Sequence, residues 1–139
     1  MKLIDIPEQI PSSELEEEIL EAFIEEIGEI HQEIVTHFNI LKNNPADLES
    51  IKNLQRNFHT LKGTGGLVGA TLIGSLGLHF EEMLNKVIDG KLSINNDILS
   101  LMEQVETMLP SMLKHFQYNQ SISDEMVLFI SQAYHFTQV

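Results

Sequence analysis

Apolar residues recur every three or four positions along most of this 139-residue chain, and that spacing limits the possible folds more than any other feature. In the first such stretch the apolar positions are Leu15, Ile19, Ala22, Phe23, Ile27, Ile30, Ile34 and Phe38. Residues at these steps share one face of an α-helix, so the pattern predicts an amphipathic helix from about Glu14 to about Leu41. Ser12 or Ser13 can cap it, and Ser13 precedes Glu16 by the three residues of a capping box.

A second and a third helix are predicted on either side of a run of glycines. Asp47 or Pro45 opens the second helix, and its core stripe is formed by Leu48, Ile51, Leu54, Phe58 and Leu61. The pattern loosens over 65–69, where we expect a break or a short loop because glycine disfavours a helix. The third helix is expected over about 71–88.

Two further helical stretches complete the chain. The fourth covers about 98–116 and should kink at Pro110, because proline lacks the backbone N–H that a helix needs. A short fifth helix is expected over 124–136. Four long amphipathic helices with short connections predict an all-α fold, an antiparallel four-helix bundle of up-down-up-down topology with an additional short C-terminal helix.

Composition narrows the class of protein. With 42% apolar residues the chain can bury one core, and we expect an N-terminal arm over 1–12, the bundle over 13–118 and a C-terminal helical extension over 119–139. The formal net charge of −13 argues against nucleic acid or an anionic membrane as a partner. The sequence has no signal peptide and no run of about 18 apolar residues, so we expect a cytoplasmic protein without membrane insertion.

The stretch FHTLKGTGG, residues 58–66, combines a histidine and a lysine with three glycines. On a helix, Phe58 joins the inward stripe, and His59 lies about 100° further round, at the edge of the buried face. Lys62 at i+3 brings a cation close to the imidazole, and Gly63 at i+4 leaves the ring uncrowded. This arrangement suits a neutral imidazole that attacks phosphorus, with a cation nearby for the phosphoryl oxygens.

The third helix offers a carboxylate for the same site. Glu81 is our candidate acceptor for the second ring nitrogen of His59, where it would fix the tautomer and stabilise the charged product. Gly74 and Gly77 lie near it on that helix. They either strip the surface there or allow close helix packing, and the sequence leaves both possibilities open. The six histidines show no metal-ligand spacing, and there is no cysteine, so no metal site is expected.

These residues resemble the histidine phosphotransfer (HPt) domains, whose core pattern is His-x-x-Lys-Gly followed by a glycine six residues on. Here the pattern is formed by His59, Lys62, Gly63 and Gly69. The resemblance extends over about residues 14–116. It is closest to the phosphotransfer domains of chemotaxis-type histidine kinases and to the HPt modules of the hybrid kinases that control type IV pili. Such domains are four- or five-helix bundles with the phosphoryl-accepting histidine on the second helix and a hydrogen-bonding glutamate on the third.

The sequence departs from the family pattern at two positions near the site. The classical chemotaxis kinases have a second histidine 19 residues after the first, and here that position is Leu78. Its neighbour His79 is therefore left out of the predicted site. Gly66 stands where the pilus-control modules commonly have an arginine, which would weaken contacts to phosphate or to a partner.

The resemblance implies a role for each residue of the pattern. His59 would accept a phosphoryl group from a kinase domain or a receiver aspartate and pass it to a receiver. Lys62 would stabilise the phosphoryl charge, and Glu81, 22 residues beyond His59, would orient the ring. The surface that meets the partner is expected to contain Gly63, Gly66, Gly69, Leu67, Val68 and Leu78.

The resemblance also implies partners. These are a response-regulator receiver domain and the catalytic domain of a histidine kinase. No cofactor is expected on this domain, and the Mg²⁺ of the reaction would be held by the partner. Since the chain has no ATP-binding motif, it is either a phosphocarrier or an HPt fragment of a larger chemotaxis-type kinase. A non-catalytic helical scaffold that docks a receiver without phosphotransfer is the other alternative, although such a protein would be expected to lose His59, Lys62 or Glu81.

Overall fold

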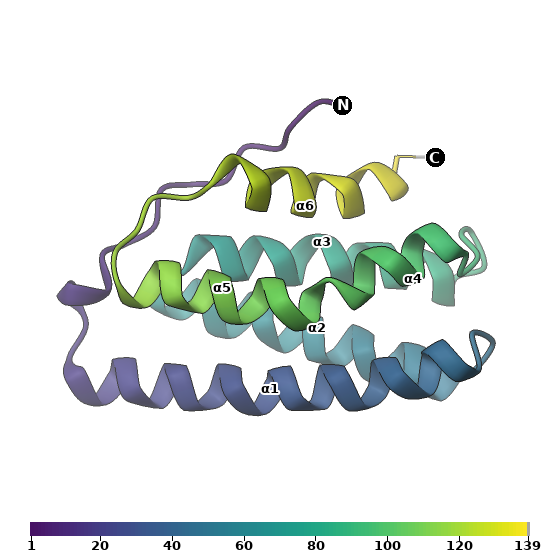
Figure 1. Ribbon diagram of the computed structural model, residues 1–139, viewed down its shortest axis with the longest axis horizontal. Helices are drawn as coiled ribbons and strands as arrows, with labels where there is room; N and C mark the ends of the chain where they lie inside the picture. The colour runs from purple at the N-terminus through teal and green to yellow at the C-terminus, as the bar shows by residue number, and fades with distance from the viewer. Residues whose placement is uncertain (139) are drawn as a thin grey trace.

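The computed structural model describes residues 1–138, and all regular structure in that range is helical (Figure 1). A single 3₁₀ turn, Ser12–Glu14, precedes the helices α1 (Glu17–Asn43), α2 (Leu48–Val68), α3 (Thr71–Ile88), α4 (Asn96–Glu103), α5 (Val105–Gln117) and α6 (Asp124–Phe136). Helices α1, α2 and α3 and the α4–α5 pair run alternately up and down, and α6 lies alongside α3. The predicted all-α bundle with an additional C-terminal helix is confirmed.

One apolar core fills the space between the helices. Its largest side chains are aromatic: the rings of Phe58 and Phe80 are 5.1 Å apart, and Phe23 meets Phe116 edge to face at 5.4 Å. All four are buried, and full burial of a phenylalanine side chain contributes roughly 1.5–3 kcal/mol. Because Phe58 lies beside His59 in the chain, this core fixes the orientation of the α2 segment that carries the histidine.

Helices α2 and α3 pack backbone against backbone where glycines line their contact. A Cβ at Gly77 would lie 2.4 Å from the backbone nitrogen of Lys62 and 2.6 Å from the carbonyl oxygen of Phe58. A Cβ at Gly65 would lie 2.7 Å from the backbone nitrogen of Gly74. Side chains do not fit at such distances, so Gly77 and Gly65 serve close packing. Of the two possibilities for Gly77, helix packing is therefore the correct one.

The predicted break over 65–69 is wrong for most of that range. Helix α2 continues to Val68, because Gly65 packs against α3 and keeps its helical conformation. The helix ends at Gly69, whose φ of +75° is left-handed and whose N–H donates to the carbonyl of Gly65. This is the usual glycine ending of a helix.

The predicted fourth helix is divided in two, and the break is not at Pro110. It lies at Gln104, between α4 and α5, while Pro110 lies inside α5. Proline deprives the carbonyl four residues earlier, that of Glu106, of its helical donor. The Nε2–H of His31 on α1 takes that place, at 2.7 Å from the Glu106 oxygen, so the helix can continue through the proline.

The start of α1 also differs from the prediction. The helix begins at Glu17, and Ser13 does not cap it, since no side chain of residues 1–138 caps this end. Ser12 is buried instead: its N–H donates to Oδ1 of Asn119 at 2.8 Å, and its hydroxyl donates to the carbonyl of Gln117 at 2.9 Å. The serine thus fastens the N-terminal segment to the end of α5.

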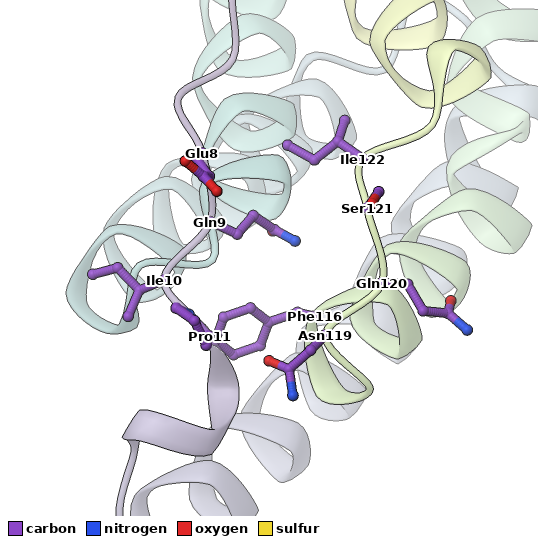
Figure 2. Close-up of a pocket in the computed structure, with 9 residues that line it drawn as sticks. All are labelled: Glu8, Gln9, Ile10, Pro11, Phe116, Asn119, Gln120, Ser121 and Ile122. Carbon is purple, nitrogen blue, oxygen red and sulfur yellow. The ribbon is translucent and has the colours of Figure 1, made fainter.

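The segment before Ser12 is extended and docked along the bundle, beside the loop that joins α5 to α6 (Figure 2). The N–H of Ile10 donates to the carbonyl of Gly69 at 3.0 Å, and Oε1 of Gln9 accepts from the N–H of Leu72 at 3.2 Å. Gln9 thereby satisfies a free N–H in the first turn of α3. A cavity of about 340 Å³ lies between this segment and the loop, lined by Glu8, Gln9, Ile10, Pro11, Phe116, Asn119, Gln120, Ser121 and Ile122.

Candidate functional site

His59 lies at the middle of α2, on the rim of the core. Its neighbours Phe58 and Leu61 are fully buried and hold this turn against the bundle. The His59 side chain is 62% exposed, as its place one step round the helix predicts. The ring is therefore fixed at its base and open to a partner at its edge.

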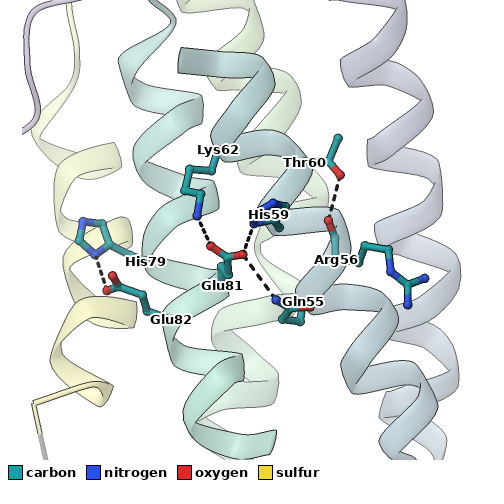
Figure 3. A network of polar contacts seen from close by, with 8 residues as sticks. All are labelled: Gln55, Arg56, His59, Thr60, Lys62, His79, Glu81 and Glu82. Carbon is teal, nitrogen blue, oxygen red and sulfur yellow. Dashed lines mark hydrogen bonds and ion pairs between the residues drawn. The ribbon is translucent and has the colours of Figure 1, made fainter. Parts of the chain in front are cut away.

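Glu81 reaches His59 from α3 (Figure 3). Its side chain is only 7% exposed, and its Oε2 lies 2.5 Å from Nδ1 of His59. The same carboxylate meets Nζ of Lys62 through Oε1, also at 2.5 Å. The three residues that the sequence suggested are thus brought together around one carboxylate, across the contact that Gly77 makes possible.

The contact with Glu81 selects the tautomer of the histidine. A carboxylate only accepts hydrogen bonds, so Nδ1 must carry the proton and donate it to Oε2. In the neutral ring the lone pair then resides on Nε2, and Nε2 has no hydrogen-bond partner among residues 1–138. A nucleophilic nitrogen is therefore available on an exposed ring whose other nitrogen is held.

The spacing alone suggests that Lys62 lies free beside His59, and the structure differs from this prediction. Its ammonium group is paired with Oε1 of Glu81, on the side of the carboxylate away from His59 (Figure 3). A cation is thus kept within one turn of the histidine. Because an ammonium group has three N–H donors, Lys62 can turn from Glu81 to another anion or bind both.

A third donor to Glu81 was not anticipated. The amide nitrogen of Gln55 lies 3.4 Å from Oε2, the oxygen that also accepts from His59. The available signal was its spacing: Gln55 precedes His59 by four residues, which is one helical turn. Glutamine is common on half-exposed helix faces, so the spacing alone did not distinguish it.

The surface beside His59 is bare on its C-terminal side. Side chains added at Gly63 and Gly66 would meet nothing within 4 Å, and Leu67 is 88% exposed. Val68 and Leu78 are half-buried. These five predicted surface residues are accessible to different degrees.

Gly69 does not belong to this open surface, and its predicted place there is wrong. It is buried, and a Cβ there would lie 2.5 Å from side-chain atoms of Ile10. The N-terminal segment covers it. Position 69 requires a glycine because α2 ends there in a left-handed conformation. Gly69 therefore has a structural role within this chain.

His79 points away from His59, to the other side of α3 (Figure 3). Its ring packs edge to face on Tyr134 of α6, with 5.5 Å between the ring centres. Burial lowers the pKa of His79 from its ordinary value of 6.5, and Glu82, 3.9 Å away, opposes this in part. The residue belongs to the contact between α3 and α6.

The part of the chain that the structure describes also bears on metal binding and membrane insertion. Within residues 1–138 no three His, Cys, Asp or Glu side chains come close enough to hold a metal ion. In the same range no helix combines the length and the apolar character needed to cross a membrane.

A helical bundle that presents an exposed histidine, bound through Nδ1 to a buried glutamate, has the architecture of a phosphotransfer module. The sequence model of the Hpt domain family matches residues 18–115, which is most of the chain. The chain therefore belongs to the Hpt domain family and is a histidine phosphotransfer module.

Three curated proteins, all much longer than this chain, are similar to it over part of their length. The chain is 28% identical over 85 residues to the sensor histidine kinase CheAY of Helicobacter pylori, covering 61% of the chain and 11% of the relative. It is 28% identical over 109 residues to the chemotaxis protein CheA of Bacillus subtilis, covering 76% of the chain and 16% of the relative. It is 28% identical over 112 residues to the chemotaxis protein CheA of Borreliella burgdorferi, covering 78% of the chain and 13% of the relative. The matched part is thus less than a fifth of each relative's length.

Proposed function

We propose that His59 is the phosphoryl acceptor of this Hpt domain, and that it exchanges the group with the aspartate of a receiver domain or takes it from a kinase catalytic domain. The observation that carries the proposal is the 2.5 Å contact between Nδ1 of His59 and Oε2 of Glu81. This contact leaves Nε2 as the nucleophile. It also keeps a buried negative charge beside the ring that becomes positive.

The transfer step follows from this geometry. The lone pair of Nε2 attacks phosphorus in line, and an Nε2–P bond forms as the P–O bond to the donor breaks. The bonding electron pair leaves with the donor oxygen, on an aspartate carboxylate or on ADP. The Nδ1 proton stays on the ring, so the product is a phosphoimidazolium whose positive charge is stabilised by Glu81.

Lys62 supplies the second electrostatic contribution in this proposal. As negative phosphoryl oxygens arrive at Nε2, the ammonium group can leave Oε1 of Glu81 and pair with them. Its stem is anchored only three residues from His59. The cation is thus kept near the histidine without occupying the position of the phosphoryl group.

The partner would dock on the open surface beside His59. Gly63 and Gly66 let it approach the backbone of α2, and Leu67 offers an apolar contact, with Val68 and Leu78 at its edge. The partner would bring the Mg²⁺ and the acidic pocket. The names of the relatives, a sensor histidine kinase and two chemotaxis proteins, support a receiver and a kinase catalytic domain as partners, either on separate proteins or within one larger kinase.

The experiment is phosphoryl transfer from a phosphorylated receiver or from a kinase catalytic domain with ATP. We expect the wild type to gain phosphate that is labile to acid and stable to base, and His59→Gln to gain none. His115→Gln is a matched control, because within residues 1–138 the His115 ring bonds only inside its own helix, to the carbonyl of Ser111. This variant should be labelled like the wild type. If His59→Gln is labelled equally well, His59 is not the acceptor.

The docking-scaffold alternative predicts a different result from the same samples. The wild type would bind the receiver, as measured by calorimetry, and take up no phosphate. Labelling of the wild type together with the loss of label in His59→Gln would rule this alternative out.

A further inference from the structure

Three donors on α2 converge on the single carboxylate of Glu81 (Figure 3). They are Gln55, His59 and Lys62, at positions i, i+4 and i+7, so they occupy three successive turns of one helix face. The sequence pattern of the family accounts for the last two only. Gln55 therefore needs an explanation of its own.

The donors are divided unequally between the two carboxylate oxygens. Among residues 1–138, Lys62 alone meets Oε1, whereas His59 and Gln55 share Oε2, at 2.5 Å and 3.4 Å. Glu81 is almost completely buried, so water cannot readily replace a lost donor, and an unpaired buried carboxylate is costly. Within residues 1–138 the Gln55 side chain makes no other hydrogen bond.

We propose that Gln55 is a positioning residue for phosphotransfer: its amide holds Glu81 on His59 when Lys62 leaves for the phosphoryl group. This inference rests on the proposed function. Once Lys62 has left, Oε1 has no donor, and the carboxylate is free to rotate away from the ring. The Gln55 amide still binds Oε2 and keeps that oxygen directed at Nδ1.

A neutral amide suits this role better than a second cation would. It donates a hydrogen bond without neutralising Glu81, so the full negative charge remains available to the phosphoimidazolium. It also has no net charge with which to compete for the phosphoryl oxygens. Gln55 would therefore act through Glu81 and would not touch the transferred group.

The test is a double-mutant cycle on single-turnover transfer from a phosphorylated receiver. Gln55→Met keeps the length of the side chain and removes the donor, and we expect it to slow transfer about threefold to tenfold in the presence of Glu81. In the Glu81→Ala background the same change should have almost no effect on the transfer rate, because the carboxylate that Gln55 binds is absent. Gln32→Met, on the exposed surface of α1, is the matched control and should transfer at the wild-type rate.

A second measurement does not depend on phosphotransfer. In ¹⁵N-resolved NMR spectra, the proton on Nδ1 of His59 should exchange slowly with water in the wild type. We expect several-fold faster exchange in Gln55→Met and loss of the signal in Glu81→Ala. This readout would not change if Gln55 only stabilised the fold.

Two results would overturn the inference. One is a Gln55→Met protein that matches the wild type in both transfer and proton exchange. The other is an equal loss of rate with and without Glu81, which would mean that Gln55 does not act through the carboxylate. If the wild type accepts no phosphate at all, the proposed function fails, and the NMR comparison still decides whether Gln55 holds Glu81 on His59.

Discussion

At the scale of single residues, Glu81 joins the parts of the site. A carboxylate that is 7% exposed loses most of its hydration, and its donors from α2 replace those lost interactions. Hydrogen bonds that involve a charged group contribute about 1.5–3 kcal/mol each. The position of His59 and that of Lys62 thus depend on the same two oxygens.

Replacing Glu81 by glutamine should separate the contribution of its negative charge to phosphotransfer from the contribution of its shape. Glu81→Gln keeps an acceptor oxygen near Nδ1 of His59 and removes the negative charge. We expect phosphotransfer to slow about tenfold to a hundredfold, because the charged product is no longer stabilised. Single-turnover rates with a phosphorylated receiver measure this, and circular dichroism should show an intact bundle. An unchanged rate would remove the charge of Glu81 from the mechanism.

Lys62 offers a second test at this scale. Lys62→Met should retain the contact between His59 and Glu81 and lose the cation for the phosphoryl oxygens. A decrease of about tenfold or more in the transfer rate is expected, with Lys62→Arg partly active because it keeps the charge. If the methionine and arginine variants transfer at the same rate, the charge of Lys62 does not assist transfer.

The residues of the site differed in how far they could be predicted. His59, Lys62 and Glu81 were identified because a histidine and a lysine at i, i+3 and a glutamate on the next helix form a recognisable pattern. Gln55 gave no such signal, since a glutamine on a helix is usually solvated. Gly69 was assigned to the wrong surface, because the spacing could not show that Ile10 covers it.

At the scale of elements, the contact between α2 and α3 determines whether the site can form. The donors lie on α2 and the acceptor on α3, so their distances depend on how closely the two backbones approach. Gly77, one turn before Glu81, sets that approach through its contact with Phe58 and Lys62. One missing side chain therefore controls the geometry of the neighbouring polar cluster.

Gly77→Ala should separate the helices and destabilise the protein. Its Cβ would have to move away from the backbone of Lys62, and overpacking of this kind costs about 1–3 kcal/mol. Gly63→Ala is the matched control: its Cβ has open space, and alanine favours a helix by roughly 1 kcal/mol, so this variant should be more stable than the wild type. Urea unfolding measures both changes. Equal stability of the two variants would contradict this account of the glycines.

The helices themselves could be predicted better than their ends. The apolar spacing identified the helices, because burial of one face leaves a regular pattern. The break at Gln104 could not be found, because neither a glycine nor a proline marks it in the sequence. Helix α5 continues through Pro110, where His31 of α1 donates to the carbonyl of Glu106, and no local pattern reveals such a distant partner.

At the scale of the whole molecule, α6 and the N-terminal segment cover the side of α3 that faces away from His59. The ring of Phe129 on α6 lies 5.4 Å from that of Phe80, and the N–H of Ile4 donates to the hydroxyl of Ser131 at 3.0 Å. The sequence showed that these segments have apolar residues. It did not show which helix they would cover, because periodicity identifies an apolar face and not its partner.

His79, within this contact, should make the stability depend on pH. Burial lowers its pKa in the folded protein, whereas the unfolded chain keeps the ordinary value of 6.5. Below about pH 6.5 the unfolded state therefore binds more protons, so the free energy of unfolding should fall as the pH is lowered through this range. Above it, the contribution of His79 is constant.

Urea unfolding of the wild type and of His79→Phe at pH 5.5 and 7.5 tests this prediction. The variant keeps a ring against Tyr134 and cannot take up a proton. We expect it to lose less stability on acidification than the wild type, because the carboxylates titrate in both proteins. Identical losses would show that protonation of His79 does not oppose the packing of α6.

The docked N-terminal segment brings the two ends of the described chain together. Nε2 of His135, near the end of α6, lies 2.9 Å from the carbonyl of Lys2, and Figure 1 shows both ends beside α6. A short flexible linker could therefore join them, and the chain could be reopened in the exposed turn at Asn44–Ala46. Such a circular permutant would retain every buried contact of the bundle. The linker would also tether the N-terminal segment at both of its ends, which should hold Gln9 more firmly against the start of α3.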